Sequence, residues 1–268
     1  MDEILSYYDS YDESSRLAGG YTSLEYTRTI ELLERYLPPP PAVVLDIGGA
    51  SGMYACPLAR MGYEVHLIDP VEKHLKQAKE ESDKQPDHPI AGISSGDARA
   101  LESPDSSVDV VLLMGPLYHL TEPDDRLKAL REAYRVLRDG GVLFATYISR
   151  YASVLDGLVF GFVHDPEFFE IVKQDLKDGQ HRNTTDNNDY FTTAYFHHPD
   201  EIKPETEEAG FKLDKILAIE GPGWLIREYD SDMKKPDRRD RILEIVRMLE
   251  EDRSLLPLSD HIAAVGRK

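Results

Sequence analysis

The stretch "VVLDIGGASGMYA", residues 43–55, joins a short apolar run to an acid and three glycines. Apolar runs of this kind are typical of strands that are covered on both faces, as the strands of parallel sheets are. Gly48, Ala50 and Gly52 then follow at a spacing of two and leave much of the backbone without side chains. Ligands of open parallel sheets bind where strands end and such turns begin, so we expect a ligand site here.

The first 150 residues alternate between predicted strands and predicted helices. Strands are expected at residues 42–48, 63–69, 90–98, 107–114 and 142–148. Helices are expected at residues 24–37, from the glycine turn to Gly62, at 70–80 and at 121–140. This alternation predicts a doubly wound parallel sheet with helices on both faces.

Two of these helices carry signals that can be checked residue by residue. The helix at 24–37 is expected to bury a face formed by Leu24, Thr27, Ile30, Leu33 and Leu37. In the helix at 121–140, Thr121 is expected to cap the first turn together with Asp124. Gly140 and Gly141 are expected to end that helix, because glycine favours the backbone conformation of helix C-termini.

Residues 151–199 interrupt the alternation. They are rich in aromatic side chains and contain the polar run "DGQHRNTTDNND", and Asp165-Pro166 predicts the start of a helix within them. We interpret this segment as an insertion that lies over a site. After it, helices are expected at 200–210 and 237–252, and strands at 211–221 and 261–267.

Composition excludes several classes of function. The chain has 268 residues and a net charge of −19, and such a surface repels phosphate backbones and anionic lipids, so nucleic acid and membranes are not expected partners. The N-terminus has no signal-peptide pattern and no run of 18 apolar residues occurs, so a cytoplasmic location is expected. The single cysteine, Cys56, excludes cysteine-rich zinc patterns, and no metal site is expected.

Acids follow three neighbouring predicted strands. Asp46, Asp69 and Asp97 would therefore line one edge of the sheet, and an acid after the second strand is suited to accept hydrogen bonds from ribose hydroxyls. A dinucleotide fingerprint that starts at Gly48 would need glycine at positions 50 and 53, where the chain has Ala50 and Met53. The nucleotide ligand is therefore not expected to be a nicotinamide dinucleotide.

Five segments, taken in order, resemble the motifs of the class I S-adenosylmethionine-dependent methyltransferases. They are "LDIGGASG" (45–52), "HLIDP" (66–70), "GDARAL" (96–101), "VDVVLLMGPLYHL" (108–120) and "YRVLRDGGVLF" (134–144). The resemblance implies a Rossmann-like, seven-stranded, mostly parallel sheet whose last strand is antiparallel. It also implies an N-terminal helical lid (1–41), a cofactor-binding core (42–150), a cap insertion over the acceptor site (151–199) and a C-terminal part of the core sheet (200–268).

The resemblance also assigns roles to residues. In the family the glycine loop passes under the methionine part of the cofactor, the acid after the second strand holds the ribose, and the third-motif acid meets the adenine. The residues expected to bind the cofactor by matching position are Asp46, Gly48, Gly49, Ala50, Gly52, Asp69, Pro70, Asp97, Ala98 and Met114. Tyr11 and Arg16 lie in an N-terminal segment that related enzymes close over the cofactor, with Arg16 suited to its carboxylate. Ala50 and Asp139 depart from the family's commoner glycine and proline.

The implied reaction is direct in-line methyl transfer to a small-molecule acceptor, with S-adenosylhomocysteine as the product. A sulfonium methyl is already activated, so the protein mainly aligns the acceptor and excludes water. His119, which follows the fourth strand, is the candidate base for an acceptor that must lose a proton. "MGPLY" lacks the Asn/Asp-Pro-Pro-Tyr pattern of the enzymes that methylate amino groups of DNA and glutamine. The alternatives are aminopropyl transfer and a catalytically silent binder of the cofactor; the sequence leaves the oligomeric state open.

Overall fold

The computed structural model describes Ile4, Tyr7, Tyr8 and residues 22–268, and it is built around a seven-stranded sheet. The strand order is β3-β2-β1-β4-β5-β9-β8, and β9 runs antiparallel to both of its neighbours. The strands are β1 (Val43–Ile47), β2 (Glu64–Asp69), β3 (Gly92–Ser95), β4 (Val108–Met114), β5 (Leu137–Ile148), β8 (Lys212–Ala218) and β9 (His261–Arg267). The expected mostly parallel, Rossmann-like sheet is therefore confirmed.

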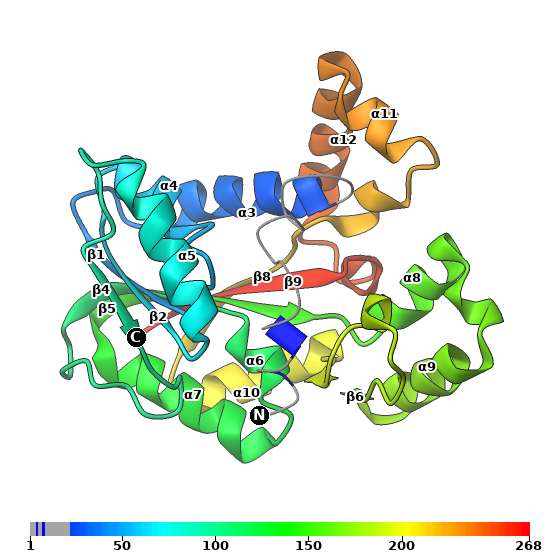
Figure 1. Cartoon of the computed structure of the whole chain (residues 1–268), viewed down its shortest axis with the longest axis horizontal. Coiled ribbons are helices and arrows are strands. Elements are labelled where there is room, and N and C mark those ends of the chain that lie inside the picture. The colour runs from blue at the N-terminus through cyan, green and yellow to red at the C-terminus, as the bar shows by residue number, and fades with distance from the viewer. Residues whose placement is uncertain (1–3, 5–6, 9–21) are drawn as a thin grey trace.

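Helices cover both faces of the sheet (Figure 1). The helices are α3 (Thr22–Tyr36), α4 (Ala55–Arg60), α5 (Glu72–Asp83), α6 (Pro116–His119), α7 (Pro123–Val136), α8 (Ala152–Phe160), α9 (Pro166–Asp178), α10 (Pro199–Glu208), α11 (Tyr229–Met233) and α12 (Pro236–Leu249). Apolar residues of α3, α4 and α5 pack against one face and those of α7 and α10 against the other. No helix in the part of the chain that the structure describes is long and apolar enough to span a membrane.

The segment 151–199 contributes α8, α9 and a short two-stranded sheet, β6 (Gln180–His181) with β7 (Ala194–Tyr195). In Figure 1, α8 and α9 stand at one end of the molecule, beside the sheet. The helix expected from Asp165-Pro166 is confirmed, because the Asp165 carboxylate accepts a hydrogen bond from the backbone N–H of Glu167 at 2.8 Å. The aromatic side chains of this segment form small apolar clusters of their own.

The predicted ends of the helix at 121–140 are wrong. Its N-cap is Glu122, without a side-chain capping bond, so Thr121 and Asp124 do not form the expected cap. The helix ends at Val136, and Gly140 and Gly141 lie inside β5, where the pairing register with β4 shifts. The physical reason is a pair of backbone hydrogen bonds: the N–H of Gly140 donates to the oxygen of Lys268, and the N–H of Lys268 donates to the oxygen of Gly141. These bonds tie the irregular part of β5 to the residue that follows β9.

The buried face of α3 differs from the predicted one at two positions. Thr27 and Ile30 are only half-buried, while Arg28 is fully buried. The Arg28 guanidinium donates to the backbone oxygen of Ile219 at 3.3 Å and forms ion pairs with Glu31 and Glu250. This arginine therefore ties α3 to the chain just after β8 and to the end of α12.

Arg28→Ala should lower the free energy of unfolding by about 3 kcal/mol, because it leaves the buried Glu250 carboxylate without this partner. Arg35→Ala is the matched control: Arg35 pairs with the same carboxylate, but its side chain is 39% exposed, and its loss should cost less than about 1 kcal/mol. Urea unfolding followed by circular dichroism measures both values. Equal losses for the two variants would contradict the buried ion pair.

Candidate active site

A pocket lies at the edge of the sheet where the parallel strands end. Residues in or directly after the neighbouring strands β3, β2, β1, β4, β5 and β9 line it. The expected residues that line it are Asp46, Gly48, Gly49, Ala50, Asp69, Pro70, Asp97, Ala98, Met114 and His119. Gly52 does not line the pocket; it packs beside Ile90 and Cys56. Tyr11 and Arg16 lie outside the described residues.

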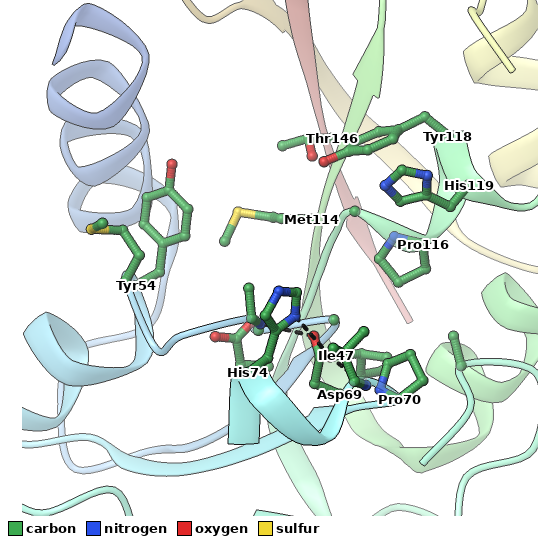
Figure 2. A pocket seen from close by; sticks show the side chains of 18 of the residues that line it. Ile47, Tyr54, Asp69, Pro70, His74, Met114, Pro116, Tyr118, His119 and Thr146 are labelled. Carbon is green, nitrogen blue, oxygen red and sulfur yellow. Dashed lines mark hydrogen bonds and ion pairs between the residues drawn. The ribbon is translucent and has the colours of Figure 1, made fainter. Parts of the chain in front are cut away.

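The side chains of the pocket converge from several elements (Figure 2). Met114 points into the pocket from the end of β4, with Tyr54 on one side of it and Tyr118 and His119 on the other. Asp69 and His74 lie together at the opposite wall, where the contact between them is drawn. The structure thus gathers into one cavity residues that are far apart in the sequence.

Asp69 organises the glycine loop from the end of β2. One of its carboxylate oxygens accepts the backbone N–H of Ala50 at 2.9 Å. The other accepts the backbone N–H of Val71 at 2.8 Å and lies 3.1 Å from Nδ1 of His74. The side chain is buried, so this carboxylate fixes the loop and forms part of the pocket wall at once.

Asp46 is a strongly perturbed acid of the pocket. It is almost fully buried, and one of its oxygens, Oδ2, has no hydrogen-bond partner among the described residues. Burial, and secondly the nearby charge of Asp69, raises the pKa of this carboxyl to about 7. A buried acid with a raised pKa in a cavity is a candidate functional group.

Asp46→Asn should stabilise the protein increasingly as pH rises from about 4 to about 7. The folded protein holds the Asp46 proton more tightly than the unfolded chain, whose carboxyl titrates near 3.8, so wild-type stability is lost over this interval. Asparagine does not titrate, so the stability difference between the two proteins should grow and then level off above pH 7. Urea unfolding across this range measures the difference, with the exposed Asp105→Asn as control. A difference independent of pH would contradict the raised pKa.

Asp97 is more accessible than the other two acids. Its side chain is 42% exposed and is held by Arg99, which also binds Asp125. The Arg99 guanidinium holds the pKa of Asp97 below its usual range. Asp97 is therefore a charged group on the pocket wall, next to Ala98.

The glycine loop needs its glycines for a reason that the sequence interpretation did not give. A Cβ at Gly48 would lie 2.8 Å from Cδ of Pro116, and one at Gly49 would lie 2.7 Å from both Oδ2 of Asp46 and Cγ of Leu67. The bare faces of these two residues are thus filled by the protein itself, whereas the expectation was that they face a ligand. Gly48 also has a φ of 74°, which disfavours other residues.

His119 ends α6 and is surrounded by aromatic rings. Its Nε2 lies 2.8 Å from the hydroxyl oxygen of Tyr8, and its ring stacks on Phe191 with centroids 5.8 Å apart. Phe191 belongs to the segment 151–199, so this segment contacts the pocket wall at this point. Burial lowers the pKa of His119 to about 4, so the imidazole is neutral at pH 7.

Several pocket residues were missed by the sequence interpretation. Glu25 and Thr29 reach the pocket from α3, Thr146 from β5 and His261 from the first position of β9. The signal for His261 was present in the predicted strand 261–267. Because β9 is antiparallel, it begins at the edge where its parallel neighbours end.

The charge of the pocket suits a cationic nucleoside. Among its described lining residues four are carboxylic acids, Glu25, Asp46, Asp69 and Asp97, and none is lysine or arginine. A sulfonium and an ammonium group are attracted by such a wall. A dinucleotide would instead bring the two negative charges of its diphosphate next to these acids.

Comparison with known proteins agrees with this arrangement. Residues 45–145 match the model of a methyltransferase domain family. The chain is 34% identical to a ubiquinone/menaquinone biosynthesis C-methyltransferase of Proteus mirabilis, over 63% of this chain and 65% of that relative. It is 30% identical to the protein of the same name from Vibrio campbellii, over 66% of this chain and 67% of that relative. The matches thus span about two thirds of the length of these relatives.

A solved structure from Thermotoga maritima, described as a possible histamine N-methyltransferase, has a similar fold. Its TM-score is 0.61 at 17% identity, covering 100% of this chain and 99% of that one. Together with the sequence relatives, this fold places the chain in a known class. The chain belongs to the class I S-adenosylmethionine-dependent methyltransferase family, and S-adenosylmethionine is its cofactor.

Proposed function

We propose that the protein transfers the methyl group of S-adenosylmethionine directly to a small-molecule acceptor. The single observation that carries this proposal is one acid-lined pocket that extends from the ends of β2 and β3 to the start of β9. When bound, S-adenosylmethionine supplies a methyl group on a positively charged sulfur, so no covalent intermediate with the enzyme is needed. The protein's task is to align the acceptor and exclude water.

The cofactor would be held by the residues that the motifs indicate and the pocket brings together. Asp69 would accept the ribose hydroxyls, and Asp97 with Ala98 would meet the adenine. The loop from Gly48 to Ala50 would lie under the methionine part, and the buried carboxyl of Asp46 would face its positive charge. Pro70 and Met114 would contribute apolar contacts.

Asp69→Ala should weaken S-adenosylmethionine binding at least tenfold, because it removes the proposed ribose acceptor and the anchor of the Ala50 N–H. Isothermal titration calorimetry measures the affinity. Asp105→Ala is the control, since that aspartate is a surface residue whose side chain is 78% exposed, and it should bind as the wild type does. Unchanged affinity in the Asp69 variant would refute the ribose assignment.

The acceptor is proposed to be small and partly apolar. Two features support this: aromatic and aliphatic side chains such as Tyr54, Met114, Tyr118 and Ile219 line the pocket beside the acids, and two relatives are named for quinone biosynthesis. The insertion 151–199 would cap this site, since Phe191 packs on His119 at its wall. His119 remains a predicted base, although an imidazole with a pKa of about 4 removes a proton from a weak acid poorly.

A panel of phenols, amines and carboxylates with radiolabelled S-adenosylmethionine tests the activity. Label should appear in one acceptor class, with an equal amount of S-adenosylhomocysteine. Binding without turnover across the whole panel would instead favour a catalytically silent binder. Release of methylthioadenosine in the presence of a polyamine would favour aminopropyl transfer.

A further inference from the structure

A histidine to which the sequence motifs assign no role lies next to the proposed ribose acceptor. His74 belongs to the first turn of α5, its side chain is buried, and it lines the pocket. Its Nδ1 lies 3.1 Å from Oδ1 of Asp69. In Figure 2 the ring of His74 stands beside Asp69 and reaches into the pocket from the helix. A ligand group that binds to Asp69 therefore comes close to His74.

Asp69 has few positions left for a ligand. Each carboxylate oxygen offers about two lone pairs to hydrogen-bond donors. Oδ1 accepts the backbone N–H of Val71 at 2.8 Å and the Nδ1–H of His74, so both of its positions are taken. Oδ2 accepts the backbone N–H of Ala50 at 2.9 Å and keeps one position among the described contacts. Asp69 can thus accept one more donor, whereas a ribose presents two neighbouring hydroxyl groups.

A second hydrogen-bond acceptor lies beside it, at Nε2 of His74. An ionised carboxylate only accepts hydrogen bonds, so Nδ1 carries the hydrogen toward Asp69, and in the neutral ring this leaves the lone pair on Nε2. Nε2 is shielded from solvent and has no hydrogen-bond partner among the described residues. Because buried polar atoms are nearly always paired, the donor for this nitrogen would come from the ligand.

Tyr8 lies over this part of the pocket wall. Its ring packs edge-on against that of His74, with the ring centroids 5.3 Å apart, and its hydroxyl oxygen lies 2.8 Å from Nε2 of His119. We expect the Tyr8 ring to shift when a ligand reaches His74, since solvent does not reach Nε2 in this arrangement.

We propose that the two ribose hydroxyls of S-adenosylmethionine are divided between Asp69 and His74. One hydroxyl donates to Oδ2 of Asp69 and the other donates to Nε2 of His74. This proposal rests on the cofactor site proposed above and refines it, since it moves one hydroxyl from Asp69 to His74. His74 thereby becomes a residue that determines which nucleosides the pocket accepts.

The division of the hydroxyls defines which nucleosides the site rejects. Both positions are acceptors, so a nucleoside that lacks either hydroxyl leaves a buried acceptor unpaired. A phosphate group on the ribose would also place a negative charge beside the carboxylate of Asp69. The site therefore takes nucleosides whose ribose carries both hydroxyls and no phosphate.

Deoxy analogues test this division. The ligands are S-adenosylhomocysteine and its 2′-deoxy and 3′-deoxy forms, and calorimetry in mildly alkaline buffer measures their affinities. The wild type should bind each deoxy form about tenfold more weakly than the parent. His74→Asn keeps an N–H donor near the place of Nδ1 but has no acceptor at the place of Nε2. This variant should bind the parent about tenfold more weakly than the wild type does, and it should no longer distinguish the parent from one of the two deoxy forms.

The pattern of affinities separates the possible causes. Discrimination that is lost for one deoxy form and kept for the other assigns the missing contact to His74. Unchanged affinities in His74→Asn, equal weakening of all three ligands, or a wild type that does not distinguish them would overturn the proposal. A wild type that binds neither S-adenosylmethionine nor S-adenosylhomocysteine would instead refute the cofactor site itself, and the division with it. His88→Asn, which changes an exposed histidine in the loop before β3, should bind all three ligands as the wild type does.

A measurement on the wild type does not depend on the folding of any variant. Long-range proton–nitrogen NMR of the full-length, ¹⁵N-histidine-labelled protein, with His74 assigned through its backbone resonances, should show hydrogen on Nδ1 and none on Nε2. The Nε2 signal should shift when S-adenosylhomocysteine binds, and it should shift less with one of the two deoxy forms. Hydrogen on Nε2, or equal shifts with all three ligands, would overturn the proposal.

Discussion

The pairing of the strands is the constraint on which the rest of the structure depends. Five parallel strands end at one edge of the sheet, and the single antiparallel strand inside it, β9, begins at that same edge. Each of the neighbouring strands β3, β2, β1, β4, β5 and β9 therefore contributes a residue of its own, or one from the loop that follows it, to the same pocket. The residues of the sequence motifs lie at the ends of the parallel strands, whereas His261 lies at the start of the antiparallel strand β9.

The same edge concentrates acids: the described lining residues include four carboxylic acids and no lysine or arginine, and of the four Asp97 is paired with Arg99 behind the wall. In a protein with a net charge of −19, repulsion between these acids lowers the stability of the folded state. Two features reduce this repulsion: Asp46 holds its proton up to a pKa of about 7, and the carboxylate of Asp69 accepts backbone N–H groups. A cationic ligand offsets the remainder. The electrostatics of the pocket thus favour a ligand that carries positive charge, as the sulfonium and ammonium groups of S-adenosylmethionine do.

The sequence predicted the strands, and the gathering of most motif residues at one edge of the sheet, because those signals are local. An apolar run, a glycine turn and an acid such as Asp46 or Asp69 lie within a few residues of each other. The failures involve distant partners: His261 of the pocket contacts Glu220, 41 positions away, and each residue looks ordinary alone. Arg28 was overlooked because an arginine in an amphipathic helix is usually exposed, and its burial depends on Glu250, 222 positions away.

Arg28 has a consequence for how the chain folds. A guanidinium with no access to solvent needs carboxylate and carbonyl partners, and besides Glu31 of the same helix these come from the C-terminal part of the chain, at Ile219 and Glu250. These contacts tie the helix before the sheet to the chain that follows β8 and to the end of α12. A fragment truncated after β5 would lack Ile219 and Glu250 and would leave Arg28 with Glu31 as its ion-pair partner, so the burial of this arginine depends on the C-terminal part of the chain.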